Sequence, residues 1–153
     1  MSGSPWRLLR RPPYMALAGI VLATLLDRAW PAHMVTGAWR YPVGAVLVLG
    51  GWALSVAAKR RFHQAGTPVR GSLPTTALVT DGVYAHTRNP LYLALLLIMT
   101  GVAVGWNNPW LVGVTGAFWL YLQVRVVADE ERRMAAQFGA DYAAYRARTR
   151  RWL

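Results

Sequence analysis

The side chains best able to do chemistry lie in two short stretches of an otherwise apolar sequence, residues 82–92 (GVYAHTRNPLY) and residues 129–131 (DEE). In the first stretch, Arg88 can bind a carboxylate or another anionic group, and His86 can act as a base near neutral pH. In the second stretch, a carboxylate can bind an amino group or hydroxyl groups. Each residue alone also fits an ordinary role, such as an arginine directed at lipid headgroups or an exposed loop histidine.

The two adjacent glutamates, Glu130 and Glu131, follow the longest uncharged part of the sequence. Successive helical residues point about 100° apart, so the two carboxylates cannot share one task. One can turn inward to a ligand while the other pairs with an arginine; the alternative is a solvated acidic turn. With 3 histidines, no cysteine and no ligand-like spacing, we expect neither a metal site nor a disulfide.

Uncharged blocks of the sequence predict the elements that position these residues. Only 15% of the 153 residues are charged and 55% are hydrophobic, whereas soluble domains are about 25% charged. A membrane-spanning helix needs about 17–25 apolar residues, which places four spans at about 13–29, 41–58, 90–106 and 109–127. Asn107-Asn108 before Pro109 predicts a tight turn at the far membrane face. The sequence therefore predicts an all-α, integral-membrane fold.

The net charge of +11 indicates an orientation. With four spans, every Lys and Arg except Arg28 and Arg40 falls on one side, which the positive-inside rule makes cytoplasmic. Both termini are then cytoplasmic in a multi-pass protein of the cell inner membrane, and the cations attract anionic membrane lipids. A nucleic-acid partner would need a soluble basic face, so none is expected. The alternative for the first span is a cleaved signal peptide, although no clear cleavage site follows it.

Residues 1–153 then form one domain with a cytoplasmic loop, 59–89, and a cytoplasmic tail, 128–153. Asp81-Gly82 predicts a turn, and Asn89-Pro90 predicts a helix start at the third span. Gly139 is expected to break the tail into amphipathic helices, with an apolar stripe on the membrane surface and arginines facing the headgroups. The stripe consists of Met134, Phe138, Tyr142 and Tyr145, and the arginines are Arg146, Arg148, Arg150 and Arg151.

These motifs follow an order that resembles the isoprenylcysteine carboxyl methyltransferase and phospholipid methyltransferase superfamily of integral-membrane enzymes. The family order is G-x-Y, R-[HN]-P-x-Y, an apolar hairpin, E-E and F-G-x-x-Y-x-x-Y. The corresponding residues, over about 70–150, are Gly82, Tyr84, Arg88, Asn89, Pro90, Tyr92, Glu130, Glu131, Phe138, Gly139, Tyr142 and Tyr145. One departure is Ala94, where many relatives have glycine, and we expect it to narrow the pocket wall slightly.

The resemblance implies a methyltransferase that uses S-adenosyl-L-methionine in a cytoplasmic-side pocket. The implied catalytic residues are Arg88, Asn89 and Glu131. The implied cofactor-binding residues are Tyr84, His86, Arg88, Asn89, Pro90, Tyr92, Glu130, Glu131, Tyr142 and Tyr145. Arg88 would hold the cofactor carboxylate or an anionic substrate group, and a glutamate would hold the cofactor amino group or ribose hydroxyls. Methyl transfer mainly needs positioning and a dry site.

The methyl acceptor stays open at this stage. A lipophilic or prenylated carboxylate is the first expectation and needs no general base, whereas a phospholipid amine or a small thiol would use His86 or a glutamate. The ratio of 16 arginines to one lysine is typical of a high-GC bacterium, which makes a prenylated protein substrate less certain. A competing class, a non-enzymatic membrane scaffold, predicts that S-adenosylmethionine does not bind.

Overall fold

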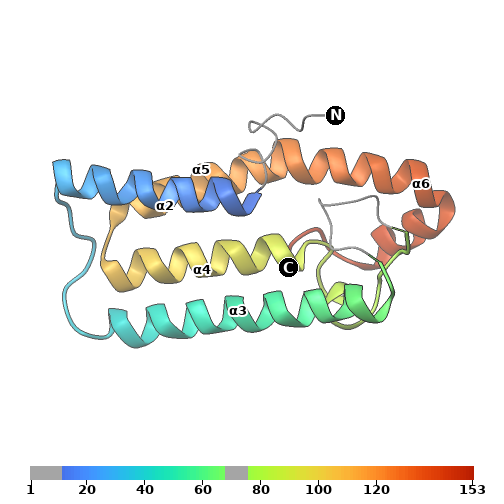
Figure 1. The fold of residues 1–153 in the computed structure, drawn as a ribbon, viewed down its shortest axis with the longest axis horizontal. Helices are drawn as coiled ribbons and strands as arrows, with labels where there is room; N and C mark the ends of the chain where they lie inside the picture. The colour runs from blue at the N-terminus through green and yellow to red at the C-terminus, as the bar shows by residue number, and fades with distance from the viewer. Residues whose placement is uncertain (1–11, 68–75) are drawn as a thin grey trace.

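The computed structural model describes residues 12–67 and 76–153, and its named elements are all helices. In chain order they are α2 (Pro12–Ala29), α3 (Arg40–Gln64), η1 (Gly82–Ala85), α4 (Pro90–Trp106), α5 (Pro109–Tyr121), η2 (Leu122–Val126) and α6 (Val127–Arg148). The helices α2 to α5 run up and down in an elongated bundle, with α2 against α5 and α3 against α4 (Figure 1). The all-α prediction is confirmed for this part of the chain. Four of the cations that were predicted to be cytoplasmic, at positions 7, 10, 11 and 70, lie outside the described residues.

Turn residues set the helix boundaries where the sequence placed them. Helix α4 begins at Pro90, and the chain reverses at Asn107, whose φ of 56° and ψ of 39° are left-handed. Asparagine tolerates this conformation better than most residues. The Asn108 side chain accepts a hydrogen bond from the Leu111 backbone N–H at 2.9 Å, which caps α5 at its start. The predicted helical hairpin is therefore confirmed.

Helix α3 is longer than the predicted span 41–58. It continues to Gln64, so Lys59, Arg60 and Arg61 are helical rather than part of the loop. Lysine and arginine are good helix formers, and no proline or glycine interrupts the helix there. Arg61 then pairs with Asp81 at 3.1 Å, which ties the following loop back to the end of α3.

Helices α3 and α4 approach closely because glycines face the partner helix. A Cβ added at Gly44 would lie 2.7 Å from the carbonyl oxygen of Gly101, and one at Gly51 would lie 2.6 Å from that of Ala94. Small residues at these positions let the two helix backbones approach closely. Ala94, which was expected to narrow a pocket wall, lies in the contact between α3 and α4.

Large apolar side chains cover the outside of the bundle. Those exposed on α2, α3, α5 and η2 include Leu17, Val21, Leu22, Leu25, Val43, Val46, Leu49, Trp52, Val112, Trp119, Leu120 and Val124. Length and composition qualify two helical segments as able to cross a membrane, α3 and the run Pro109–Arg148 formed by α5, η2 and α6, with apolar windows only 17% and 22% buried. Helix α4 is apolar but has 17 residues, and α2 contains Asp27 and Arg28. These criteria thus support two spans where the sequence predicted four.

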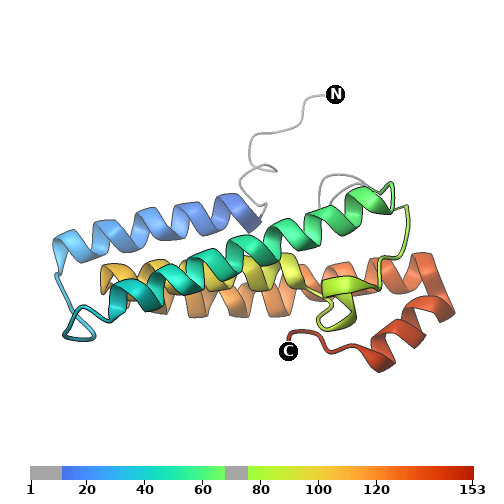
Figure 2. The same cartoon turned by 90° about the horizontal axis from the view of Figure 1, so that it is seen from below.

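The tail turns back on itself at Gly139, part-way along α6, where φ is 49° and ψ is −118°; Figure 2 shows the C-terminal helix reversing its direction. The predicted helix break is confirmed. The apolar stripe does not lie on the membrane surface as expected, because this reversal folds it inward. Its members Met134, Tyr142 and Tyr145 form a buried cluster, against which Phe138 and Leu78 pack.

Candidate functional site

The predicted site residues gather at one end of the bundle, where α3 ends, α4 begins and the end of the chain returns (Figure 1). The loop into α4 opens at Gly82, whose φ of 58° confirms the predicted turn. The next residues form η1, in which Tyr84 is buried and packs edge-on against Phe62 of α3, with ring centroids 5.3 Å apart. This packing fixes the path of the loop that carries Arg88.

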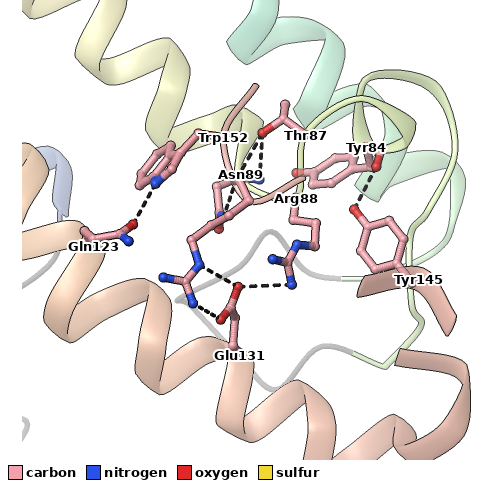
Figure 3. A network of polar contacts seen from close by, with 9 residues as sticks. Tyr84, Thr87, Arg88, Asn89, Gln123, Glu131, Tyr145 and Trp152 are labelled. Atoms are coloured by element: carbon pink, nitrogen blue, oxygen red, sulfur yellow. Dashed lines mark hydrogen bonds and ion pairs between the residues drawn. The ribbon is translucent and has the colours of Figure 1, made fainter. Parts of the chain in front are cut away.

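Glu131 lies between two arginines that are far apart in the sequence (Figure 3). Arg88 Nη1 is 3.1 Å from Glu131 Oε1. Arg151 donates from Nε to the same oxygen at 3.0 Å and from Nη2 to Glu131 Oε2 at 2.5 Å. The side chains of Arg88 and Glu131 are only 9% and 12% exposed. Two guanidinium groups and one carboxylate leave one net positive charge, which suits an anionic group of a ligand.

Glu130 points to a different partner from Glu131. It is buried, and its Oε1 accepts a hydrogen bond from the hydroxyl of Tyr92 at 2.7 Å. Tyr92 packs in turn against the main apolar core of the bundle. The two carboxylates therefore contact different residues, as expected, and Glu131 pairs with Arg88 and Arg151.

Asn89 and Pro90 are buried at the entrance to α4. The Asn89 side chain donates from Nδ2 to the carbonyl oxygen of Arg151 at 2.9 Å. The backbone N–H of Arg88 donates to the carbonyl oxygen of Arg150 at 3.0 Å. The entrance of α4 is therefore held by the main chain of residues that follow α6.

The remaining predicted residues differ in their setting. The Tyr145 hydroxyl donates to the carbonyl oxygen of Tyr84 at 2.7 Å, and Tyr142 packs edge-on against Tyr145 with ring centroids 6.2 Å apart. These tyrosines secure the loop from the side of α6. His86 is exposed. Within residues 12–67 and 76–153, no group of three or more His, Cys, Asp or Glu side chains could hold a metal ion.

Sequence reasoning missed three residues of this region. Arg151 was expected to face headgroups, which is wrong because it forms the two-point pair with Glu131. Trp152 Nε1 donates to Gln123 Oε1 at 2.7 Å, and Gln123 belongs to η2, a π-helical turn. Turns of this kind are frequent at functional sites. Nothing in the sequence distinguishes Arg151 from its neighbouring arginines, because only the folded chain brings it to Glu131.

A family model for phospholipid methyltransferases matches residues 39–141, well over half of the chain. The chain belongs to the phospholipid methyltransferase family. The resemblance inferred from the motifs is confirmed, and the match includes both the α4 entrance and the paired glutamates. No curated protein matches the chain.

Membership of the phospholipid methyltransferase family implies that the chain is a methyltransferase. Together with the two long apolar helices, it indicates a membrane protein. The match begins just before α3 and ends within α6, so α2 and the residues after 141 lie outside it.

Proposed function

We propose that the protein transfers a methyl group from S-adenosyl-L-methionine to a lipophilic acceptor at the cytoplasmic face of the membrane. The observation that carries this proposal is the nearly buried pair of Arg88 and Glu131, joined by the partly exposed Arg151, at one end of an apolar bundle. Burying ionised groups costs several kcal/mol per ion before their attraction offsets it. A polar ligand that binds there would interact with these charges, which otherwise only hold segments of the chain together.

The proposal includes a multi-pass arrangement in the cell inner membrane, with α2 to α5 all crossing and both termini cytoplasmic. Support comes from the exposed apolar faces of α2, α3 and α5. Helix α3 has 25 residues, a length of about 37 Å, which exceeds the hydrocarbon core of about 30 Å. The shorter α4 packs between α3 and α5. Exposed tryptophans mark the end of the bundle away from the site, as in an interfacial aromatic belt: Trp30, Trp39, Trp106 and Trp110.

S-adenosyl-L-methionine supplies an activated methyl group, and the side chains present suit its charged ends. In the proposal, Arg88 binds the cofactor carboxylate, since the group around Glu131 carries a net positive charge. Glu130, which is buried beside the Tyr92 hydroxyl, binds the amino group or the ribose hydroxyls. The face of Tyr92 or Tyr84 attracts the sulfonium.

The other predicted site residues have supporting roles in this proposal. Asn89 and Pro90 set the α4 entrance, and Tyr142 and Tyr145 close the opposite side through the packed tyrosine pair. His86 is exposed, which suits a residue at the rim of a site rather than inside it.

The acceptor divides the proposal into two candidates. A lipophilic carboxylate would attack the methyl group directly, without a base. A phospholipid amine is the second candidate, favoured by the family to which the chain belongs. A phospholipid amine is protonated near neutral pH, so this ammonium must lose a proton before its nitrogen can attack the methyl group, and the buried Glu130 beside the Tyr92 hydroxyl is the group proposed to accept the proton.

Two measurements on the detergent-solubilised protein test the proposal. Calorimetry with S-adenosylhomocysteine should show saturable binding to one site per chain. Methyl-labelled S-adenosylmethionine, incubated with the protein and a membrane extract, should then label a lipid-soluble product. Identification of that product as an ester or an N-methylated amine decides between the two acceptors. The absence of cofactor binding would contradict both and favour a non-enzymatic scaffold.

A further inference from the structure

Residues 149–152, Thr149-Arg150-Arg151-Trp152, form a short extended segment that we call the strap. It follows α6 and lies beyond residue 141, where the family match ends. A parallel backbone bridge joins Thr87 to Arg150, and Trp152 packs against the main apolar core. The strap therefore crosses from the tail of the chain into the space between α4 and the start of α6 (Figure 3).

The strap contacts residues that are proposed above to form the cofactor site. Its carbonyl oxygens accept hydrogen bonds from the backbone N–H of Arg88 and from the side chain of Asn89. The guanidinium of Arg151, a strap residue, donates hydrogen bonds to both carboxylate oxygens of Glu131. A carboxylate with a single contact to Arg88 could still rotate, whereas a two-point guanidinium contact fixes its plane.

We propose that Arg151 and Trp152 are positioning residues of the methyltransferase site, with Arg151 orienting Glu131 and Arg88, and Trp152 fastening the strap to η2. This inference rests on the proposed function and adds residues that neither the motifs nor the family match assign. The strap thereby sets the affinity for the amino-acid end of the cofactor. It acts through Glu131, Arg88 and Asn89.

The anchoring of the strap supports this role. The Trp152 indole donates to Gln123 of the π-helical turn at 2.7 Å, eight residues before Glu131 on the same continuous run of helix. One end of the strap is thus fixed to the helix that carries the paired glutamates, and the other end is fixed to the loop that carries Arg88. A strap that only closed the bundle would need the main-chain contacts and the tryptophan, but not a two-point pair to Glu131.

The test measures binding of S-adenosylhomocysteine to the full chain in detergent by calorimetry. Arg151→Ala should raise Kd at least about tenfold, the equivalent of losing one charge-assisted interaction. Arg151→Lys should fall between the wild type and Arg151→Ala, because an ammonium attracts Glu131 without gripping both oxygens. The matched control is Arg150→Ala, which removes an exposed cation next in sequence and keeps the backbone contact to Arg88. Its Kd should stay within about twofold of the wild type.

A second ligand separates positioning from general loosening of the fold. Methylthioadenosine lacks the amino-acid end of the cofactor, so Arg151→Ala should weaken its binding much less than that of S-adenosylhomocysteine. Equal weakening of both ligands, unchanged binding in Arg151→Ala, or an equal loss in Arg150→Ala would each overturn the inference. If Arg151→Ala does not fold, Arg151→Lys and Trp152→Phe decide it, since both must weaken S-adenosylhomocysteine binding while thermal unfolding stays close to that of the wild type.

Failure of this inference is distinguishable from failure of the proposed function. A wild-type protein that does not bind S-adenosylhomocysteine contradicts the function itself. A wild-type protein that binds, together with strap variants that bind equally well, contradicts only the positioning role of the strap.

Discussion

The two ends of the helical bundle join distant segments of the chain by different means. At the hairpin tip, Asn107 Oδ1 accepts hydrogen bonds from the backbone N–H groups of Met34 and Val35 at 2.9 and 3.0 Å, and its Nδ2 donates to the Val35 carbonyl oxygen at 2.9 Å. Asn108 donates from Nδ2 to the Ala23 carbonyl oxygen at 3.3 Å. Every one of these contacts joins a neutral amide to the backbone.

At the site end, ionised side chains contact one another. Arg88 and Glu131 form a nearly buried ion pair, and the partly exposed Arg151 joins it. Neutral amides are enough to hold two loops together, as the hairpin tip demonstrates, and ionised groups cost more to desolvate. This difference supports the proposal that the charges at the site end bind a ligand, because neutral contacts suffice to hold the other end together.

Replacement of Glu131 by Gln should have the largest effect. It leaves the buried Arg88 and the partly exposed Arg151 without the carboxylate that holds them, and breaking a fully buried pair costs about 3–5 kcal/mol. We expect methyl transfer to a membrane extract to fall at least about 100-fold, measured as an initial rate with labelled S-adenosylmethionine. Asp129→Asn, which removes an exposed acid paired with Arg132, should leave the rate within about twofold. Similar rates for Glu131→Gln and the wild type would remove the contrast between the two ends.

Asn107→Ala tests the hairpin tip. The change removes the partner of two N–H groups and one carbonyl oxygen, so we expect a loss of about 2–4 kcal/mol in the free energy of unfolding. Asn107→Gly keeps the left-handed backbone accessible and isolates the contribution of the amide. Thermal unfolding in detergent measures the loss. S-adenosylhomocysteine binding by the folded fraction should not change, and a large change in Kd would mean that the tip takes part in function.

Gly51→Ala tests the close packing of α3 against α4, which lies between the two ends of the bundle. The new methyl group would lie 2.6 Å from the Ala94 carbonyl oxygen, so α3 and α4 must separate, at a cost of about 1–3 kcal/mol. The neighbouring Gly50→Ala meets nothing within 4 Å and should be neutral or stabilising by up to about 1 kcal/mol, since alanine favours helices. Thermal unfolding of the two variants side by side gives the comparison, and equal stability would show that this contact is not close in solution.

Tyr92→Phe should have the smallest effect of the four variants, and it tests whether Glu130 contacts the cofactor. Phe keeps the ring in the core but removes the hydroxyl that donates to Glu130. We expect S-adenosylhomocysteine to bind about fivefold to tenfold more weakly, the equivalent of about 1–1.4 kcal/mol. Tyr14→Phe, on an exposed ring of α2, is the control and should bind normally. Unaltered binding in Tyr92→Phe would move the proposed cofactor contact away from Glu130.

The features that could be predicted from sequence are those that local chemistry decides. Pro90 begins α4, Asn107 reverses the chain and Gly139 breaks the tail because each residue type restricts or permits particular backbone angles. The divergence of Glu130 and Glu131 follows from helical geometry alone. The family motifs identified the same two stretches that the fold brings to one end of the bundle.

The features that could not be predicted depend on contacts between distant residues. The apolar stripe of the tail looked suited to a membrane surface, since spacing reveals an apolar face but not what covers it. Its burial follows from the direction in which the chain returns after Gly139. Four apolar segments likewise predicted four spans, while length and composition of the actual helices qualify two.

The sequence by itself determined the helices, their turns, the family and the residue types of the site, because periodicity, turn chemistry and motif order are local properties of the chain. Only the tertiary structure decided which charges meet. Several arginines crowd the end of the sequence with the same intrinsic chemistry, and the fold selects Arg151 by carrying the strap back between α4 and α6. Electrostatic and hydrogen-bond energies depend on distance and burial, and both are fixed only when the chain has packed.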